Sequence, residues 1–481
     1  MKHPWAGLRR RAPVVAVIVG AAVTLSACVS AEHRAPQIAV PAAFDHVGAT
    51  GESDALDRWW SLFGDRQLDA LIDEALRHAP DAKTALAVLE EARAARVQSL
   101  TRFNVQGDVA AGAALRQTRT TGLPSADQGV FSGAIAPSWE LDLFGRRAAL
   151  RRAVDGDLDA ARFQYEGTRQ TLAGNVAGGL FEARANAVRL EQARFTLRIA
   201  TDLARLGERR VAVGIGSRAD AASLTADEAT AEAAVKGFEV QVEIARRTLL
   251  ILLGRGTDPV STLPIDAVFD MPPAVPGTTP ATLLVRRPDI RQAEARLRSA
   301  AGDLKLDALA LLPTFNLLGQ ASYAPITGAG GLTTSIWSIG AGLALPLLDR
   351  PRLLAEVRGQ RARTEQAVIA YENAVQAGFG EAQNALSLYA ADKTRLVALA
   401  RAEERARFAF DAQRAGYQAG VVDLATLLQA ERIWRTNLAA LSDLRAQMLT
   451  DAVNLFRALG GGWPATGAAA ATMTNDVEAR P

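Results

Sequence analysis

The 481-residue chain contains one cysteine, Cys28, so an intramolecular disulfide bond is excluded. It also lacks an excess of charge of either sign, because 54 basic residues face 52 acidic ones. Nucleic-acid-binding proteins usually carry a basic excess, and this balance argues against such a partner. The four histidines have no spacing typical of metal ligands; they are His3, His33, His46 and His78.

Signs of catalysis are equally sparse. Residues 214–219 fit a loose GxGxxA pattern, but they follow a long predicted helix, whereas the dinucleotide-binding fingerprint requires a preceding strand. A second glycine-rich stretch, 328–331, is better explained as an external loop than as a phosphate-binding one. We therefore expect neither an enzyme nor a cofactor, apart from a covalent lipid discussed below.

Proline is absent from two long stretches, 138–258 and 352–463, which are rich in Ala, Leu, Arg, Glu and Gln. Proline breaks helices and these residues favour them, so each stretch predicts a pair of long helices joined by a glycine-containing turn. The first hairpin is expected at 148–253 and the second at 353–459. The longest helix, 353–419, would measure ~100 Å at about 1.5 Å per residue, far more than a globular helix.

A two-residue period replaces the helical one in four segments, in which apolar residues alternate with small or polar ones. The predicted strands are ~103–116, ~130–144, ~314–324 and ~335–348. A transmembrane strand needs about 9–11 residues, and each segment is long enough. We expect one face to meet lipid and the other a wet lumen. The polar alternates are Asn104, Gln106, Asp108, Glu140, Asp142 and Gln320.

The order helix, two strands, long helix, shorter helix occurs twice, so the chain contains an internal repeat. We place the first repeat at 58–254, a linker at 255–280 and the second repeat at 281–463. Four strands cannot close a transmembrane barrel, since known closed barrels begin at about eight strands and an open edge is costly in lipid. Several copies must therefore share one barrel. A soluble half-exposed sheet is the simpler alternative.

The N-terminus has the features of a signal peptide over 1–27, with basic residues followed by a short apolar core at 12–24. The sequence Leu-Ser-Ala-Cys ending at Cys28 resembles a bacterial lipoprotein cleavage box, which makes Cys28 the expected acylated first residue. Val29 favours the outer membrane over inner-membrane retention. An ordinary signal peptide with a chance cysteine is the alternative. Residues 28–57 are expected to be a tether, and 464–481 a disordered tail.

Three motifs carry a family resemblance. Residues 59–68 (WWSLFGDRQL), 138–146 (SWELDLFGR) and 283–294 (LLVRRPDIRQAE) resemble motifs of the outer-membrane efflux factors of the TolC/OprM type, in their lipoprotein branch. The resemblance implies an α+β membrane protein: a homotrimer with a twelve-stranded β-barrel, four strands per chain, above a long periplasmic α-helical barrel. It also implies a periplasmic adaptor and an inner-membrane pump, commonly of the resistance-nodulation-division (RND) class, and export of drugs or toxic metabolites.

The main functional alternative is a periplasmic coiled-coil lipoprotein that acts as a scaffold or adaptor. Such proteins also combine helical hairpins with lipid anchors. They lack four alternating strands of membrane length, and this chain has them. The sequence therefore favours the channel.

The resemblance also gives the hairpin turns a role, because the periplasmic end of these channels is closed by inward-curling helix pairs held by tyrosine, aspartate and arginine contacts. The matching positions are Tyr417 and Arg432, with Asp220 as a candidate acceptor. Asp423 is either a second acceptor or the cap of the helix that follows it.

The narrowest ring of the channel is less well matched. Ala425 and Gln429 stand where relatives carry a constricting leucine and an aspartate. The ring is therefore either wider in this protein or formed by Leu424 or Leu428.

Overall fold

The structure is a computed structural model. It describes residues 32–45, 56–118, 121, 126–269, 271–274, 279–327 and 333–464. The predicted signal peptide, Cys28 and the predicted tail beyond residue 464 lie outside the described residues.

The chain divides into two compact units. The strand unit consists of the described parts of 1–37, 89–162 and 292–372, and the hairpin unit of those of 38–88, 163–291 and 373–481. Each unit draws on both halves of the sequence, so the units do not coincide with the predicted repeats at 58–254 and 281–463. The reason is that elements from the two halves pair with each other, as strands in one unit and as helices in the other.

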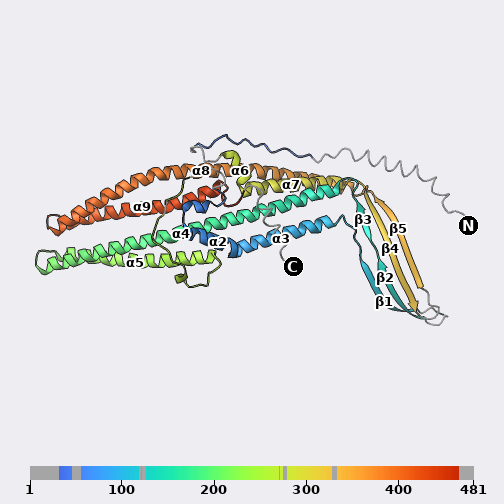
Figure 1. The fold of residues 1–481 in the computed structure, drawn as a ribbon, viewed down its shortest axis with the longest axis horizontal. Coiled ribbons are helices and arrows are strands. Elements are labelled where there is room, and N and C mark those ends of the chain that lie inside the picture. Colours follow the sequence, from blue (N-terminus) through green and yellow to red (C-terminus); the bar gives the residue numbers. More distant parts are fainter. Residues whose placement is uncertain are drawn as a thin grey trace. The chain divides into compact units, whose positions relative to one another are not determined.

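The strand unit contains one antiparallel sheet (Figure 1). Its strands are β1 (Val109–Thr118), β2 (Ala126–Ile135), β3 (Ser138–Leu141), β4 (Thr314–Thr327) and β5 (Thr333–Ala344). β4 pairs along one edge with β2 and β3, and along the other with β5, while β1 pairs with β2. Within the described residues, β1 and β5 therefore stand at the two outer edges.

Four strands were expected, and the second is divided in two. Pro137 separates β2 from β3, because proline has no N–H to donate to a strand ladder. The first strand begins at Val109 rather than near 103, and only an isolated bridge between Gln106 and Ser138 precedes it. The last strand ends at Ala344, before Pro346, rather than at 348.

The pairing register confirms the expected apolar face of the sheet. Phe315 lies opposite Leu343, and Trp139 opposite Leu317. Trp337 and Ile339 on β5 are 82% and 72% exposed in the single chain. Such large exposed apolar side chains on a pleated sheet need a nonaqueous neighbour. Most alternate positions are small or polar, as in the pair of Gln320 and Ser338, with large apolar exceptions such as Leu318 on β4 and Ile336 on β5.

The long hairpins closely match the sequence prediction. The first consists of α4 (Arg146–Ala212) and α5 (Arg218–Leu252), and the second of α8 (Arg350–Gln418) and α9 (Leu424–Ala458). Shorter elements complete the fold: η3 (Trp59–Phe63), α2 (Arg66–His78), α3 (Pro80–Thr101), η4 (Val260–Thr262), α6 (Pro280–Arg286) and α7 (Pro288–Leu309). No helix among the described residues is long and apolar enough to cross a membrane.

The residues of the three sequence motifs join different elements of the fold through ring stacking, helix caps and ion pairs. In the first, Trp59 stacks on Phe456 with ring centroids 5.6 Å apart, and Asp65 caps α2 and pairs with Arg184 at 2.7 Å. In the third motif, 283–294, buried Arg287 pairs with Glu381 at 2.7 Å and donates to the carbonyl oxygen of Ala458.

The remaining motif corrects two expectations about the lumen. Glu140 is not a free lumenal carboxylate, because it pairs with buried Arg146 at 3.1 Å. Asp142 accepts hydrogen bonds from the backbone amides of Gly145, Arg146 and Arg147, and so caps the start of α4. Asn104, Gln106 and Asp108 precede the first strand.

The described N-terminal segment, 32–45, runs extended along α8. In the strand unit, Arg34 binds both oxygens of Glu372, at 2.6 and 3.0 Å, and also Glu365 at 3.0 Å. The Arg34 contact lowers the pKa of Glu372 to about 2. In the hairpin unit, Phe44 stacks on Phe379 with centroids 5.7 Å apart. The segment is therefore fixed at several points of one helix.

Candidate gate at the hairpin turns

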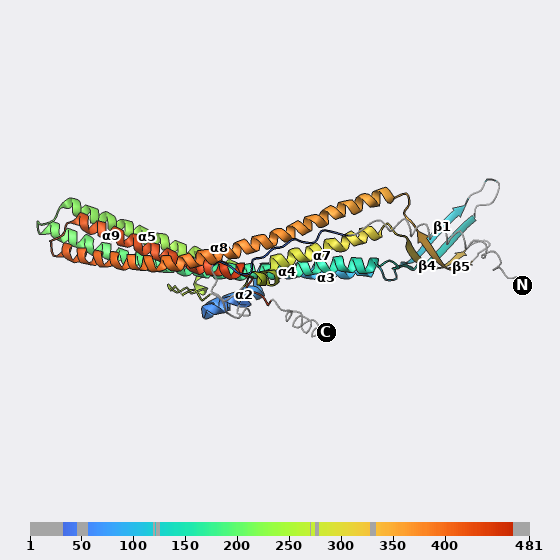
Figure 2. The same cartoon turned by 90° about the horizontal axis from the view of Figure 1, so that it is seen from above.

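The two hairpins of the hairpin unit lie side by side, with their turns at the same end (Figures 1 and 2). Each turn depends on a glycine in the left-handed region, Gly214 at φ 76° and Gly420 at φ 77°. Each return helix then begins at a side-chain cap. Ser217 accepts from the amide of Ala219 at 3.1 Å, and Asp423 accepts from that of Thr426 at 2.8 Å.

A hydrophobic cluster joins the hairpins near these turns. Trp434 of α9 stacks on Phe410 of α8 at a centroid distance of 5.1 Å and an interplanar angle of 4°, and meets Phe195 of α4 edge-on. The buried members are Ile199, Leu203, Ala204, Leu224, Ala406, Phe410, Tyr417, Leu424, Leu427 and Trp434. The cluster draws on all four helices, so the hairpin ends pack as one body.

Tyr417 is held by an arginine of the other hairpin. The Arg210 guanidinium lies 4.8 Å from the centre of the Tyr417 ring, and its Nη1 donates to the Tyr417 carbonyl oxygen at 3.1 Å. The same oxygen accepts from the amide of Gly420 at 3.1 Å. Tyr417 is only 4% exposed. The Arg210 guanidinium, the Tyr417 ring and the turn at Gly420 are thus linked through Tyr417.

Sequence reasoning assigned this contact to Arg432, which the structure leaves exposed and, among the described residues, without an ion pair. A sequence signal for Arg210 existed. It lies in the last turn of α4, where a cation favours the helix C-terminus, four residues before Gly214. Tyr417 is similarly close to its own turn, three residues before Gly420.

The aspartates have separate positions. Of the two alternatives for Asp423, the structure shows the cap, and the hydrogen bonds from the Thr426 amide and hydroxyl lower the pKa of its carboxyl group. Asp220 is exposed in the first turn of α5. Within one chain, neither carboxylate binds Tyr417 or Arg432.

The leucines proposed for the narrowest ring point into the bundle. Leu424 is 8% exposed and belongs to the hydrophobic cluster, and Leu428 packs against it. Ala425, Gln429 and Arg432 are exposed instead. These three positions recur at helical spacing and share one face of α9. That face therefore presents the methyl group of Ala425, the amide of Gln429 and the guanidinium of Arg432.

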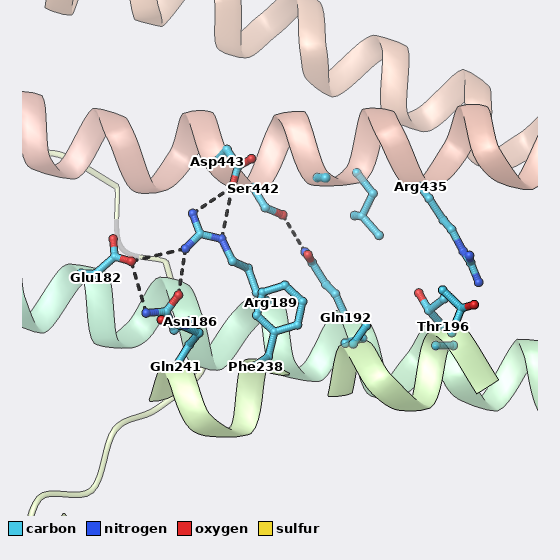
Figure 3. Close-up of a pocket in the computed structure, with 16 residues that line it drawn as sticks. Glu182, Asn186, Arg189, Gln192, Thr196, Phe238, Gln241, Arg435, Ser442 and Asp443 are labelled. Carbon is cyan, nitrogen blue, oxygen red and sulfur yellow. Dashed lines mark hydrogen bonds and ion pairs between the residues drawn. The ribbon is translucent and has the colours of Figure 1, made fainter. Parts of the chain in front are cut away.

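A second set of polar contacts joins the hairpins farther from the turns, around a cavity of about 570 Å³ between α4, α5 and α9 (Figure 3). Arg189 donates to Asp443 at 2.8 and 3.2 Å and to the Asn186 amide oxygen at 2.9 Å. Gln192 donates to the Ser442 hydroxyl at 2.6 Å. These contacts and the Arg210 contact together hold α9 and the end of α8 against α4.

Two carboxyl groups meet between the helices of the second hairpin. The side chain of Asp392 on α8 has no exposed surface and accepts from Arg395 at 2.7 Å. Burial and the hydrogen bond with Asp392 raise the pKa of Asp451 on α9 to about 6. A nearby second carboxyl group makes the ionised form of a carboxyl group less favourable. The hairpin thus contains a carboxyl group, Asp451, whose pKa lies well above its usual range.

Among the described residues, the sheet has two unpaired edges and an exposed apolar face, and the helices form two paired hairpins. These features are typical of one class of protein, the outer-membrane channels that several chains build together around a helical tunnel. The chain belongs to the outer membrane efflux protein family, whose sequence model matches residues 71–255 and 279–461. It is an outer-membrane channel of a tripartite efflux system and extends into the periplasm. Channels of this family are trimers and work with a periplasmic adaptor and an inner-membrane RND pump.

Known proteins resemble the chain over nearly its whole length. It is 29% identical over 460 residues to the pyoverdine export outer membrane protein OpmQ of Pseudomonas aeruginosa, covering 93% of this chain and 96% of that protein. It is 30% identical over 455 residues to the outer membrane protein OprJ of the same organism, covering 92% and 94%. The solved structure of the outer-membrane channel OprN aligns with a TM-score of 0.79 at 26% identity, over 90% of this chain and all of that one.

Proposed function

We propose that the turns at Gly214 and Gly420 form the periplasmic gate of this efflux channel, and that the Arg210–Tyr417 contact keeps it closed. The observation that carries the proposal is the contact itself, since it ties the turn of one hairpin to the end of the other. Opening would move the second hairpin away from the first and break this contact. Three copies in the trimer would give three such latches.

A contact between neighbouring copies would complete the gate. Arg432, Gln429 and Asp220 are exposed in the single chain and are therefore available to a second copy. The expected Tyr417–Arg432 contact would have to form in this way, between subunits.

Single-channel conductance in planar bilayers separates the two latches. Arg210→Ala should raise the conductance if the contact within the chain closes the gate, and Arg432→Ser should raise it if a contact between chains does. Tyr417→Phe alone should change little, because phenylalanine keeps both the ring and the carbonyl oxygen that Arg210 contacts. Wild-type conductance in both Arg210→Ala and Arg432→Ser would remove these residues from the gate.

Further expectations from the sequence remain proposals. We propose that Cys28 carries the covalent lipid, supported by the cleavage box before it, and that the protein needs no cofactor and catalyses no reaction. The two segments matched by the family model support 58–254 and 281–463 as structural repeats. We propose small organic molecules as the cargo, which the name of OpmQ supports for that relative.

A further inference from the structure

The helices of the strand unit carry uncompensated positive charge near the sheet. Arg147, Arg151, Arg152 and Lys305, called here the basic rim, are all exposed, and none forms an ion pair in the part of the chain that the structure describes. The rim side chains are thus free to bind an external anion.

Nearby acidic groups are already occupied. Glu140 pairs with Arg146 at 3.1 Å, Asp155 with Arg96 at 2.5 Å and Asp159 with Arg298 at 3.0 Å. Asp157 accepts from the Ser299 hydroxyl at 2.6 Å. These four carboxylates therefore have partners of their own.

Exposed leucines lie beside the rim, where the strands give way to the helices. Leu143, between β3 and α4, is 61% exposed, and Leu347 and Leu348, between β5 and α8, are 63% and 97% exposed. The two junctions occupy equivalent places in the two halves of the sequence. Apolar side chains followed by cationic ones are the arrangement of a segment that lies at the surface of a bilayer.

The spacing along α4 fits that location. Arg147, Arg151 and Arg152 are the second, sixth and seventh residues of the helix, which begins at Arg146. At about 1.5 Å per residue they lie within ~9 Å of its start. The headgroup layer is about 5–7 Å thick on each side of a hydrocarbon core of about 30 Å. With the leucines at the edge of the hydrocarbon, the guanidinium groups reach the phosphate layer.

A cavity of about 960 Å³ in the same unit adds room for a headgroup. Arg152 and Lys305 line it, and Leu297, Ala301 and Gly302 give it an apolar part. Glu32, Asp155 and Glu294 line it too, so the whole cavity is not cationic. Of the charged lining residues, Arg152 and Lys305 are cations without an ion pair, and Glu32 is a carboxylate without one among the described residues.

We propose that the basic rim and the three junction leucines bind phospholipids of the periplasmic leaflet, and that the rim selects anionic headgroups. The proposal uses the location of the channel in the outer membrane and is independent of the proposed gate. Arginine forms paired hydrogen bonds with phosphate oxygens, and the leucines cover the first methylene groups of the acyl chains.

The test uses the full-length trimer in detergent, titrated with phosphatidylglycerol or phosphatidylcholine, with bound lipids counted by native mass spectrometry. Wild type should retain phosphatidylglycerol in preference to phosphatidylcholine. The variant R147Q/R151Q/R152Q should need at least about tenfold more phosphatidylglycerol for half occupancy, since each basic residue near an anionic surface contributes measurably to binding. R147K/R151K/R152K should keep most of the preference.

The control variant R401Q/R405Q/R445Q removes the same charge from exposed arginines of the hairpin unit and should bind lipid as wild type does. Equal retention of the two lipids by wild type, or unchanged binding by R147Q/R151Q/R152Q, would overturn the proposal. Displacement of the lipid by millimolar inorganic phosphate would show a phosphate site instead. Loss of the trimer in R147Q/R151Q/R152Q would make the rim a subunit contact.

Discussion

Replacing Arg210 by alanine should open the channel, and the structure sets the size of the effect. The substitution removes a cation–π contact at 4.8 Å, worth about 0.5–2 kcal/mol, and a charge-assisted hydrogen bond, worth about 1.5–3 kcal/mol. The carbonyl oxygen of Tyr417 keeps its bond from Gly420, so no buried acceptor is left unpaired. We therefore expect the low end of the sum, about 2 kcal/mol in each chain. That shifts the closed-to-open ratio by roughly 30-fold per chain, since about 1.4 kcal/mol corresponds to tenfold.

The measurement is single-channel conductance of the reconstituted trimer, with thermal unfolding recorded in parallel. Arg209→Ala is the matched control, because Arg209 is the preceding residue, is exposed and has no ion pair among the described residues. Tyr417→Ala should raise conductance less than Arg210→Ala does, because alanine loses the ring but keeps the carbonyl oxygen that Arg210 contacts. The double variant should add little to Arg210→Ala, since Arg210→Ala already removes both parts of the contact. If Arg210→Ala forms a stable trimer with wild-type conductance, the latch does not exist.

Three further predictions follow from the chemistry of single side chains. The pKa of Asp451 is raised to about 6, so the folded state binds this proton more tightly than the unfolded chain does. Asp451 should therefore stabilise the folded state below about pH 4, and this stabilisation should be lost as the pH rises through 6. We expect roughly 1 kcal/mol after allowing for its partial exposure, seen as a falling melting temperature that Asp451→Asn no longer shows. Asp65→Ala should cost about 2–4 kcal/mol, because it removes the cap of α2 and the ion pair with buried Arg184, whereas Asp73→Ala, at an exposed pair, should cost under about 0.5 kcal/mol; equal melting temperatures would contradict this. Cys28→Ser should abolish labelling with radioactive palmitate while the protein stays in the outer membrane, and a labelled variant would refute acylation at Cys28.

The sequence determines the hairpins because their signals are local. Uninterrupted helix formers, a glycine at each reversal and a capping side chain after it place the ends of α4, α5, α8 and α9 within a few residues. The strands were predictable to a lesser degree. The alternation of apolar and polar residues continues through Pro137 and upstream of Val109. Only the pairing with neighbouring strands shows where the hydrogen-bonded strands begin and end.

The gate was less predictable, since it depends on which faces of the helices meet. Leu424 looked suited to a constriction and is buried in the hydrophobic cluster instead. Arg432 was expected as the partner of Tyr417, and within one chain it is Arg210 that contacts Tyr417, from a helix about 200 positions earlier. Glu140 and Asp142 fit an alternating polar face, yet local capping and an ion pair engage them first. Such long-range choices leave no periodic signal.

The two outer edges of the sheet have a consequence for biogenesis. β1 has 10 residues and β5 has 12, and among the described residues each is paired along one side only. About half of the backbone polar groups on each edge strand would point into hydrocarbon if a lone chain entered the bilayer, at several kcal/mol per group. Membrane insertion must therefore be coupled to association, and its rate should depend steeply on the concentration of unassembled chains. A chain with one defective edge would be incorporated and spoil two sound ones, so mutations there should act dominantly.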